Sequence, residues 1–372
     1  MGKRELLIAL AFIVAGTVAF QFSAPPAKSE STGFSFSKLL TQARREMRGN
    51  QSYVAPARQL AYAVDADITE LRLAGSAGAL KIVGEARPDV SLELTVTSTG
   101  ENEAAAIAIA AKTLVKEDRF GHVLTLEFQF PEEETQTSQA VLKVPARLAV
   151  RLNANRDTTV SNVRAVDFAG PMRGATDVSQ ISEHVAGTQS GGTVTLASVA
   201  GVKMTLTRTR ARITALTGDA SLDISDGDTE ITGAAGSLTI EQRRGDVTVR
   251  QPRGLLKVTG SDGQVRIIEA GGEVQVDLRR AEVDAELSGH ATGALTTTDE
   301  ELRVTFREPV AVRVDAVSTN GKIDAQDWNV APTISANDAR IDVALGTKTA
   351  SAPRVSLRNQ GANIVLKKSS KK

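Results

Sequence analysis

Apolar and polar residues alternate in short stretches that recur every 18 positions between residues 204 and 285. An alternation with period 2 is typical of a β-strand that buries one face. The equivalent apolar positions form two columns, Ile213, Ile231, Val249 and Ile267 in one and Thr229, Val247, Val265 and Val283 in the other. A fixed period with two strand-like halves is typical of stacked repeats. The pattern therefore predicts a mainly β protein, a parallel β-solenoid (β-helix) with about 18 residues per coil.

Two further columns share this period. Glycine recurs at positions 227, 245 and 263, and a charged column runs Arg208, Asp226, Arg244, Asp262, Arg280, changing sign at each step. Equivalent residues of stacked parallel coils lie about 4.8 Å apart, so that like charges would repel and alternating charges neutralise one another. Asp-Gly and Asn-Gly pairs also suggest an antiparallel meander of hairpins. In a meander, however, residues 18 apart would lie two strands away, and the charge column would have no cause.

The other arm of each coil carries pairs of apolar residues with one residue between them. These pairs are Leu222 and Ile224, Leu238 and Ile240, Leu256 and Val258, and Val274 and Val276. Their spacing predicts a slip of two residues between Leu222 and Leu238, which a longer turn before Gly245 absorbs. Residues 288–300 lose the period and predict a protruding loop. Strand–turn–strand units return at 312–325 and 355–366, so the solenoid is predicted over 153–366, with a basic tail at 367–372.

Residues 59–152 follow a different pattern. Short alternating strands surround an alanine-rich segment, 101–117, which has acidic residues in its first turn and is typical of a helix. The end coil of a solenoid would otherwise expose apolar side chains and strand edges. We therefore expect residues 59–152 to form a small α+β capping region.

The N-terminus carries a membrane signal. Lys3 and Arg4 precede an apolar run from Leu6 to Phe20. This predicts a cytoplasmic N-terminus at 1–4 and a transmembrane signal anchor at 5–22, because the positive end stays inside. A cleaved signal peptide, and hence a secreted protein, remains the alternative. Residues 23–58 are predicted as a linker, within which residues 34–48 are expected to form an amphipathic helix on the membrane surface.

Composition excludes several functions. Lys and Arg together number 44, as do Asp and Glu, and aromatic residues make up 3%. Neither a strong field nor stacking surfaces favour nucleic acid, so no nucleic-acid partner is expected. The chain has no cysteine, which excludes disulfides, cysteine zinc sites and thiol catalysis. His122, His184 and His290 share no ligand spacing, and no phosphate loop or nucleophile elbow occurs. We predict no catalytic, cofactor or metal site.

One pair of acids tests that prediction. Asp228 and Asp246 occupy one column, with Asp226 and Asp262 nearby. Carboxylates this close could share a proton or bind calcium, as in an enzyme that acts on envelope polysaccharide. Alternatively, they are turn residues that point into water beside Arg244. An aromatic platform for sugar is not evident, because Trp328, Tyr53 and Tyr62 all lie outside the regular coils.

Segments 143–153 (KVPARLAVRLN), 237–254 (SLTIEQRRGDVTVRQPRG) and 353–368 (PRVSLRNQGANIVLKK) resemble a bacterial family of β-strand-repeat envelope proteins named "putative adhesins". The resemblance implies an exported, β-helix-like domain, often tethered to the membrane. It implies no site residues.

Together with the N-terminal signal, the resemblance predicts a single-pass protein of the bacterial inner membrane whose soluble domain lies outside the cytoplasm. The expected role is a non-catalytic, adhesin-like or scaffold surface for an envelope protein or glycan. A polysaccharide enzyme and a bactofilin-like filament, joined end to end through terminal coils, are the alternatives. The partner, the oligomeric state and the handedness of the solenoid stay open.

Overall fold

The computed structural model describes residues 51–76, 78–154, 156–347 and 352–369. The predicted anchor at 5–22, the amphipathic helix at 34–48 and the linker up to residue 50 lie outside these residues. Within the described ranges, no helix is both long and apolar enough to cross a membrane. Residues 51–372 form one compact unit, and the description below concerns that unit alone.

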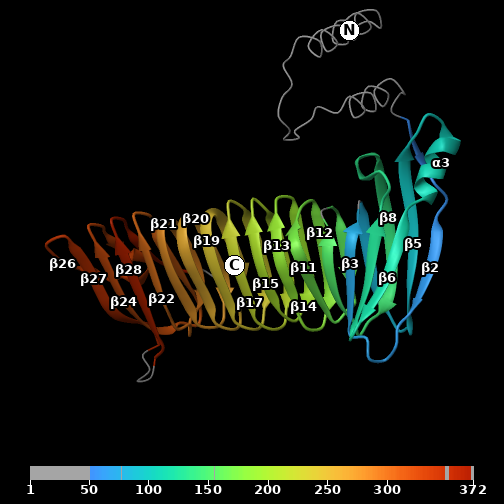
Figure 1. The fold of residues 1–372 in the computed structure, drawn as a ribbon. Coiled ribbons are helices and arrows are strands. Elements are labelled where there is room, and N and C mark those ends of the chain that lie inside the picture. The colour runs from blue at the N-terminus through green and yellow to red at the C-terminus, as the bar shows by residue number, and fades with distance from the viewer. Residues whose placement is uncertain (1–50, 77, 155, 348–351, 370–372) are drawn as a thin grey trace, which may run out of the picture. The chain divides into compact units, whose positions relative to one another are not determined.

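The described unit is mainly β, and its strands stack in a row (Figure 1). The N-terminal elements are β1 (Ser52–Val54), β2 (Arg58–Ala63), β3 (Glu70–Ser76), β4 (Ala79–Glu85), β5 (Asp89–Thr99), α3 (Glu103–Ala111), β6 (Leu114–Phe120), β7 (Val123–Gln129), the 3-10 helix η1 (Glu133–Thr135) and β8 (Gln136–Pro145). The central strands are β9 (Ala149–Ala154), β10 (Thr158–Ser161), β11 (Ala165–Met172), β12 (Ala175–Ile181), β13 (Val185–Ser190), β14 (Thr193–Val199), β15 (Val202–Thr207), β16 (Arg210–Leu216), β17 (Ala220–Ser225), β18 (Asp228–Ala234), β19 (Leu238–Arg250), β20 (Leu256–Ala270) and β21 (Val274–Ser288). The C-terminal elements are β22 (Gly293–Thr298), β23 (Leu302–Arg307), β24 (Ala311–Thr319), β25 (Ile323–Asp324), the 3-10 helix η2 (Gln326–Trp328), β26 (Thr333–Ser335), β27 (Asp338–Gly346), β28 (Arg354–Gln360) and β29 (Ile364–Lys368).

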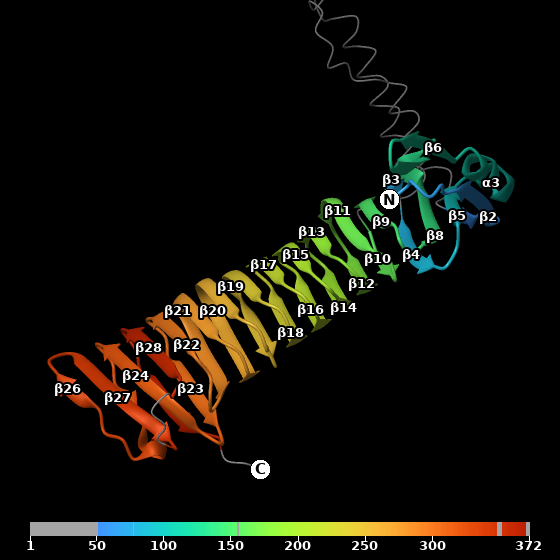
Figure 2. The ribbon, with the colours of Figure 1, turned by 90° about the horizontal axis from the view of Figure 1, so that it is seen from below.

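Each coil contributes two arms, and equivalent arms pair in parallel. We call the two resulting rows of strands ladder 1 and ladder 2. Ladder 1 runs through β9, β11, β13, β15, β17 and the first halves of β19, β20 and β21, and ladder 2 runs through β10, β12, β14, β16, β18 and the second halves of the same three strands. Figure 2 shows the strands of ladder 2 side by side. The parallel, solenoid-like stacking inferred from the sequence is therefore present.

The predicted columns align in space. Ile213 is paired with Ile231, Ile231 with Val249, and Val249 with Ile267. These four side chains are at most 1% exposed. The stack is close at the glycine column, because a Cβ at Gly245 would collide with the carbonyl oxygen of Gly227. Apolar residues from both ladders thus form one continuous core along the stack.

The predicted slip between Leu222 and Leu238 is wrong. Leu238 pairs with Ala220, and Leu222 pairs with Ile240, so the spacing stays at 18. Gln242 then occupies the inward position equivalent to Ile224 and is fully buried. Its amide donates a hydrogen bond to the carbonyl oxygen of Gly245. Because Gln242 is a polar residue at a core position, the pattern of apolar residues does not reveal the register of this strand.

Three other predicted elements have different bounds. The helix predicted at 101–117 spans only Glu103–Ala111, and β-branched Thr113 and Val115 lie outside it, Val115 within β6. Asn102 caps this helix, because its side chain accepts a hydrogen bond from the Ala105 amide at 2.9 Å. The loop predicted at 288–300 contains strand β22. Of the basic tail predicted at 367–372, Lys367 and Lys368 belong to strand β29.

At both ends of the stack, the order of the strands in space differs from their order in the sequence. At the N-terminal end, β3 lies between β7 and β9, and β4 lies between β8 and β10, all in parallel. Parallel stacking therefore begins before residue 153, the predicted start of the repeats. At the C-terminal end, β28 lies between β22 and β24 (Figure 1), and β29 lies between β23 and β25.

Antiparallel strands close both ends. Strand β5 pairs with β8 and carries β1 and β2 on its other side, while α3 packs against β5. Strand β6 pairs with β7. At the far end, β27 pairs with β24, and β26 pairs with β27. Through these pairings ladder 1 extends from β9 through β3 and β7 to β6 at one end. At the other end it extends from β21 through β22, β28, β24 and β27 to β26.

Candidate functional site

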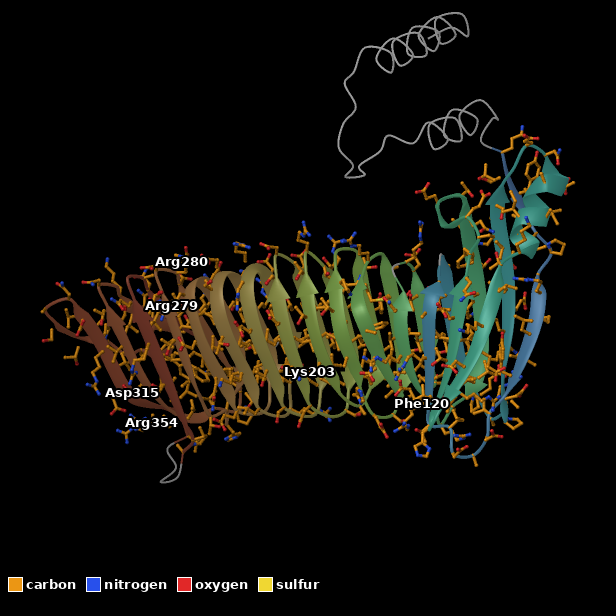
Figure 3. The ribbon with its side chains drawn as sticks, viewed as in Figure 1. Phe120, Lys203, Arg279, Arg280, Asp315 and Arg354 are labelled. Carbon is orange, nitrogen blue, oxygen red and sulfur yellow. The ribbon has the colours of Figure 1, made fainter. Side chains whose placement is uncertain are left out.

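The charge column lies at a sharp corner of each coil. All five of its residues have left-handed backbone, with φ between 51° and 58°. Arg244 donates two hydrogen bonds to Asp226, at 2.6 and 2.9 Å, and Arg280 donates two to Asp262, at 2.8 and 3.1 Å. Each aspartate is therefore held by the arginine of the following coil. Figure 3 labels Arg280 at this edge of the stack.

These contacts alter the acidity of both carboxyl groups. Hydrogen bonds from Arg280 and then from Ser261 lower the pKa of Asp262 to about 2. The hydrogen bonds from Arg244 also hold the pKa of Asp226 below its ordinary value. Both aspartates are thus ionised and engaged within the column at neutral pH.

The acid pair considered from the sequence is brought together but not enclosed. Asp228 pairs with Asp246 across β18 and β19, and both are exposed. Arg210 lies 3.9 Å from Asp228, whereas Arg244, the compensating residue expected from the sequence, contacts Asp226. Asp228 and Asp246 form an open acidic pair on the surface of ladder 2.

The three histidines are exposed and separate. Nδ1 of His122 lies 2.8 Å from the carbonyl oxygen of Asp67, and Nε2 of His184 lies 3.3 Å from Oδ1 of Asp167. Among the described residues, no group of three or more His, Asp or Glu side chains is placed to hold a metal ion.

A basic cluster that the sequence did not indicate covers the C-terminal end of ladder 1. It consists of Arg313, Asp315, Arg340, Asp342, Arg354 and Arg358, from β24, β27 and β28. We call it the arginine cluster. With four arginines and two aspartates, it carries a formal charge of about +2 at neutral pH.

Asp315 is the centre of the arginine cluster. Its side chain is only 4% exposed because guanidinium groups cover it. Arg354 and Arg358 donate hydrogen bonds to its Oδ2 at 2.7 and 2.9 Å, and Arg340 lies 3.9 Å from its Oδ1. Burial would raise the pKa of Asp315, but the hydrogen bonds from Arg358 and Arg354 outweigh it, and the pKa is lowered. Arg313 donates two hydrogen bonds to Asp342, both at 2.8 Å.

The cluster keeps free donor groups. The side chains of Arg340 and Arg354 are both 62% exposed. Arg354 uses one nitrogen toward Asp315, and the guanidinium of Arg340 makes no hydrogen bond within the described part of the chain. Arg354 also lines a shallow depression of about 630 Å³ over β20, β21 and β22. Its other lining side chains include Lys257, Gln275, Asp277 and Thr296. Figure 3 shows Asp315 and Arg354 near the C-terminal end.

Exposed apolar side chains gather at strand edges. Among the described residues, the large ones are Val54, Leu114, Phe120 and Ile334, of which Phe120 is 84% exposed. Leu114 and Phe120 lie on edge strand β6, and Ile334 lies on edge strand β26. The sequence offers little signal for β6, because LVKEDRF (114–120) holds four consecutive charged residues and no apolar–polar alternation, and the helix predicted over 101–117 includes its first four residues.

Comparison with known proteins finds solved structures that align with this chain at low identity and low TM-score. No protein-family model and no curated protein matches it. A solved "putative cell adhesion protein" from Clostridium sporogenes aligns over 84% of this chain and 100% of its own, with 10% identity and a TM-score of 0.20. A "putative adhesin" from Parabacteroides distasonis has 11% identity and a TM-score of 0.26 over 84% and 97% of the two chains. One from Bacteroides fragilis has 8% identity and a TM-score of 0.19 over the same shares. These matches are to bacterial proteins named "putative adhesin" or "putative cell adhesion protein", the family that the sequence resembles, at low identity.

Proposed function

We propose that this protein is a membrane-anchored, non-catalytic, adhesin-like protein of the bacterial envelope. In this proposal the N-terminal segment 5–22 tethers the chain, and the solenoid holds a binding surface away from the membrane. The partner is an acidic glycan of the envelope or of a neighbouring cell surface, and it binds at the arginine cluster.

The observation that carries this proposal is the excess of arginine around Asp315. Two aspartates neutralise only part of four guanidinium charges, and Arg340 and Arg354 remain more than half exposed. Arginine binds carboxylate and sulfate groups through two parallel N–H donors. The neighbouring depression offers an amine, an amide, hydroxyl groups and two carboxylates, those of Glu273 and Asp277, which are suitable partners for sugar hydroxyls. Charge and hydrogen-bonding groups therefore match an acidic polysaccharide.

The acids of the repeats support a binding role over catalysis. Asp226 and Asp262 are each held by an arginine, and Asp228 lies open beside Arg210. A glycosidase needs one carboxyl group whose pKa is raised so that it can donate a proton. In the acids of the charge column, the pKa is shifted the opposite way.

Binding of two acidic polymers, heparin and polygalacturonate, tests the proposal, with neutral dextran as the reference. We expect both polymers to bind, dextran not to bind, and affinity to fall with salt. The variant R340A/R354A should lose most of the binding. Its matched control is K203A/R279A, which also removes two exposed positive charges (Figure 3). Equal loss in both variants would show that only net charge matters and would overturn the assignment of the site.

A further inference from the structure

Strand β6 ends ladder 1 and has one side without a partner strand in the described part of the chain. Its pairing there is with β7 alone, and six of its seven residues are exposed, Val115 being half-buried. Alternate backbone N–H and C=O groups of an edge strand point away from the sheet and can pair with another strand. Natural proteins usually protect such edges with charges or proline.

One face of β6 is satisfied within the chain. Val115, Glu117 and Arg119 lie opposite the core residues Phe128, Leu126 and Leu124 of β7. Val115 packs against the core. Arg119 contacts Glu117 at 2.7 Å and Asp65 at 3.0 Å. This face covers the end of the core and needs no further partner.

The other face is unsatisfied. It carries Leu114, Lys116, Asp118 and Phe120, and the two apolar side chains are 60% and 84% exposed. Among the described residues, neither Lys116 nor Asp118 forms a side-chain hydrogen bond or an ion pair. Apolar, positive, negative and apolar groups therefore follow one another along a free edge.

This order is self-complementary. If a second copy of β6 lies antiparallel beside the first, with Glu117 opposite its own equivalent, Leu114 faces Phe120 and Lys116 faces Asp118. Directly opposite side chains in an antiparallel pair interact, and opposite charges or apolar pairs stabilise it. The charges that would normally protect an edge attract each other in this register. The two Glu117 side chains also meet, but each is neutralised by its own Arg119.

We propose that β6 is a homodimerisation edge, at which two copies join ladder 1 into one sheet across a two-fold axis through Glu117. Such an isologous contact closes on itself and forms no filament. A seven-residue edge buries less than the roughly 800 Å² per partner of a standard interface, so the dimer is weak and reversible. Its partner is a second copy of this chain rather than an unrelated strand, because the sequence LVKEDRF matches itself.

A single cysteine tests the register directly, because the chain has no cysteine of its own. Residues opposite one another in an antiparallel pair lie about 4.5 to 5.5 Å apart at Cα, which suits a disulfide. The full chain with Glu117→Cys, in membranes or detergent, should form a disulfide-linked dimer on mild oxidation. Thr333→Cys on edge strand β26 is the control and should stay monomeric. Equal dimer yields in the two variants, or none in Glu117→Cys, would overturn the proposal.

Charge exchange provides a second test. Lys116→Asp places two acids opposite each other, and Asp118→Lys places two lysines opposite each other. Each single variant should weaken dimerisation by about tenfold or more. The double variant K116D/D118K restores both pairs and should dimerise again, as should a mixture of the two single variants. All of these changes lie on an exposed face, so circular dichroism should show an unchanged fold. A double variant as weak as the single variants would overturn the pairing.

Discussion

Arg244 binds Asp226, the residue 18 positions before it, through two hydrogen bonds between adjacent coils. The contact shows that the 18-residue period of the sequence is also the repeat of the stacked coils, because only in-register parallel stacking places these residues side by side. It repeats between Arg280 and Asp262. Left-handed backbone at every position of the column turns the chain from one ladder to the other, and the side chains neutralise one another along that corner.

The ion pairs of the column predict acid sensitivity. The pKa of Asp262 is lowered to about 2 in the folded protein, below the usual value of about 3.9 in an unfolded chain. A lowered folded pKa gives stability that is present above about pH 4 and is lost as pH falls toward 2. We therefore expect the melting temperature to fall over this range when it is measured by circular dichroism.

The double variant D262N/R280Q tests the source of this effect. It removes both charges from one pair, and its melting temperature should depend less on pH between about 4 and 2 than that of the wild-type chain. Asp226, Asp315 and Asp342 also have lowered pKa values, so part of the acid sensitivity should remain. An unchanged pH dependence would contradict the role of this pair.

The faces of β19 predict opposite effects of aspartate at neighbouring positions. Val249 is fully buried, so Val249→Asp places an unpaired charge in the core and should cost about 3 to 5 kcal/mol of unfolding free energy. Thr248 points outward beside Glu230 and Arg266, so Thr248→Asp should change stability by less than about 1 kcal/mol. Urea unfolding followed by circular dichroism measures both. Equal midpoints would show that the faces are wrongly assigned.

The glycine column predicts a steric effect of a single methyl group. A Cβ at Gly245 would meet the backbone carbonyl of Gly227 in the preceding coil. Backbone cannot move aside as a side chain can, so Gly245→Ala should cost about 1 to 3 kcal/mol. Gly271 is the matched control, because the nearest atom to its added Cβ is the Pro252 carbonyl oxygen at 3.8 Å. Thermal melts measure the effect, and equal melting temperatures for Gly245→Ala and Gly271→Ala would contradict close stacking at this corner.

The regular coils could be predicted because each signal there is local and repeats. Val247 and Val249 share one period with Val265 and Ile267, and the structure pairs them accordingly. An alignment of apolar residues by type predicts a slip at Leu238 that the structure does not have. Gln242 is buried at a position that Leu206 and Ile224 occupy in the two preceding coils. Its side-chain amide donates a hydrogen bond inside the corner, and a pattern of hydrophobic residues cannot indicate such a buried polar residue.

The ends of the stack and the candidate site could not be predicted in this way. Strand β3 pairs with β7 and β9, and β28 pairs with β22 and β24, so these neighbours are set by long-range packing rather than by period. The arginine cluster also depends on the position of β28 beside β24, because this position places Arg354 beside Asp315. Thus the surface proposed for binding exists only where chain order and spatial order differ.

The position of β28 and β29 predicts the effect of a C-terminal deletion. In a solenoid stacked in chain order, removing the last coil would only shorten the stack. Here β28 and β29 lie between the coil of β22 and β23 and the coil of β24 and β25. Deleting residues 352–372 should therefore detach β24–β27 from the core, expose the buried carboxylate of Asp315 and abolish binding of acidic polymers.

Hydrogen exchange measured by mass spectrometry can locate this loss. We expect strands β24 to β27 to lose protection in the 352–372 deletion, while β15 to β20 keep theirs, because stacked coils depend mainly on their immediate neighbours. Deleting only residues 370–372 is the control and should leave β24 to β27 protected. If the larger deletion leaves these strands protected as well, they must pack on the coil of β22 and β23 without β28 and β29, and the inserted coil is not what holds the C-terminal cap in place.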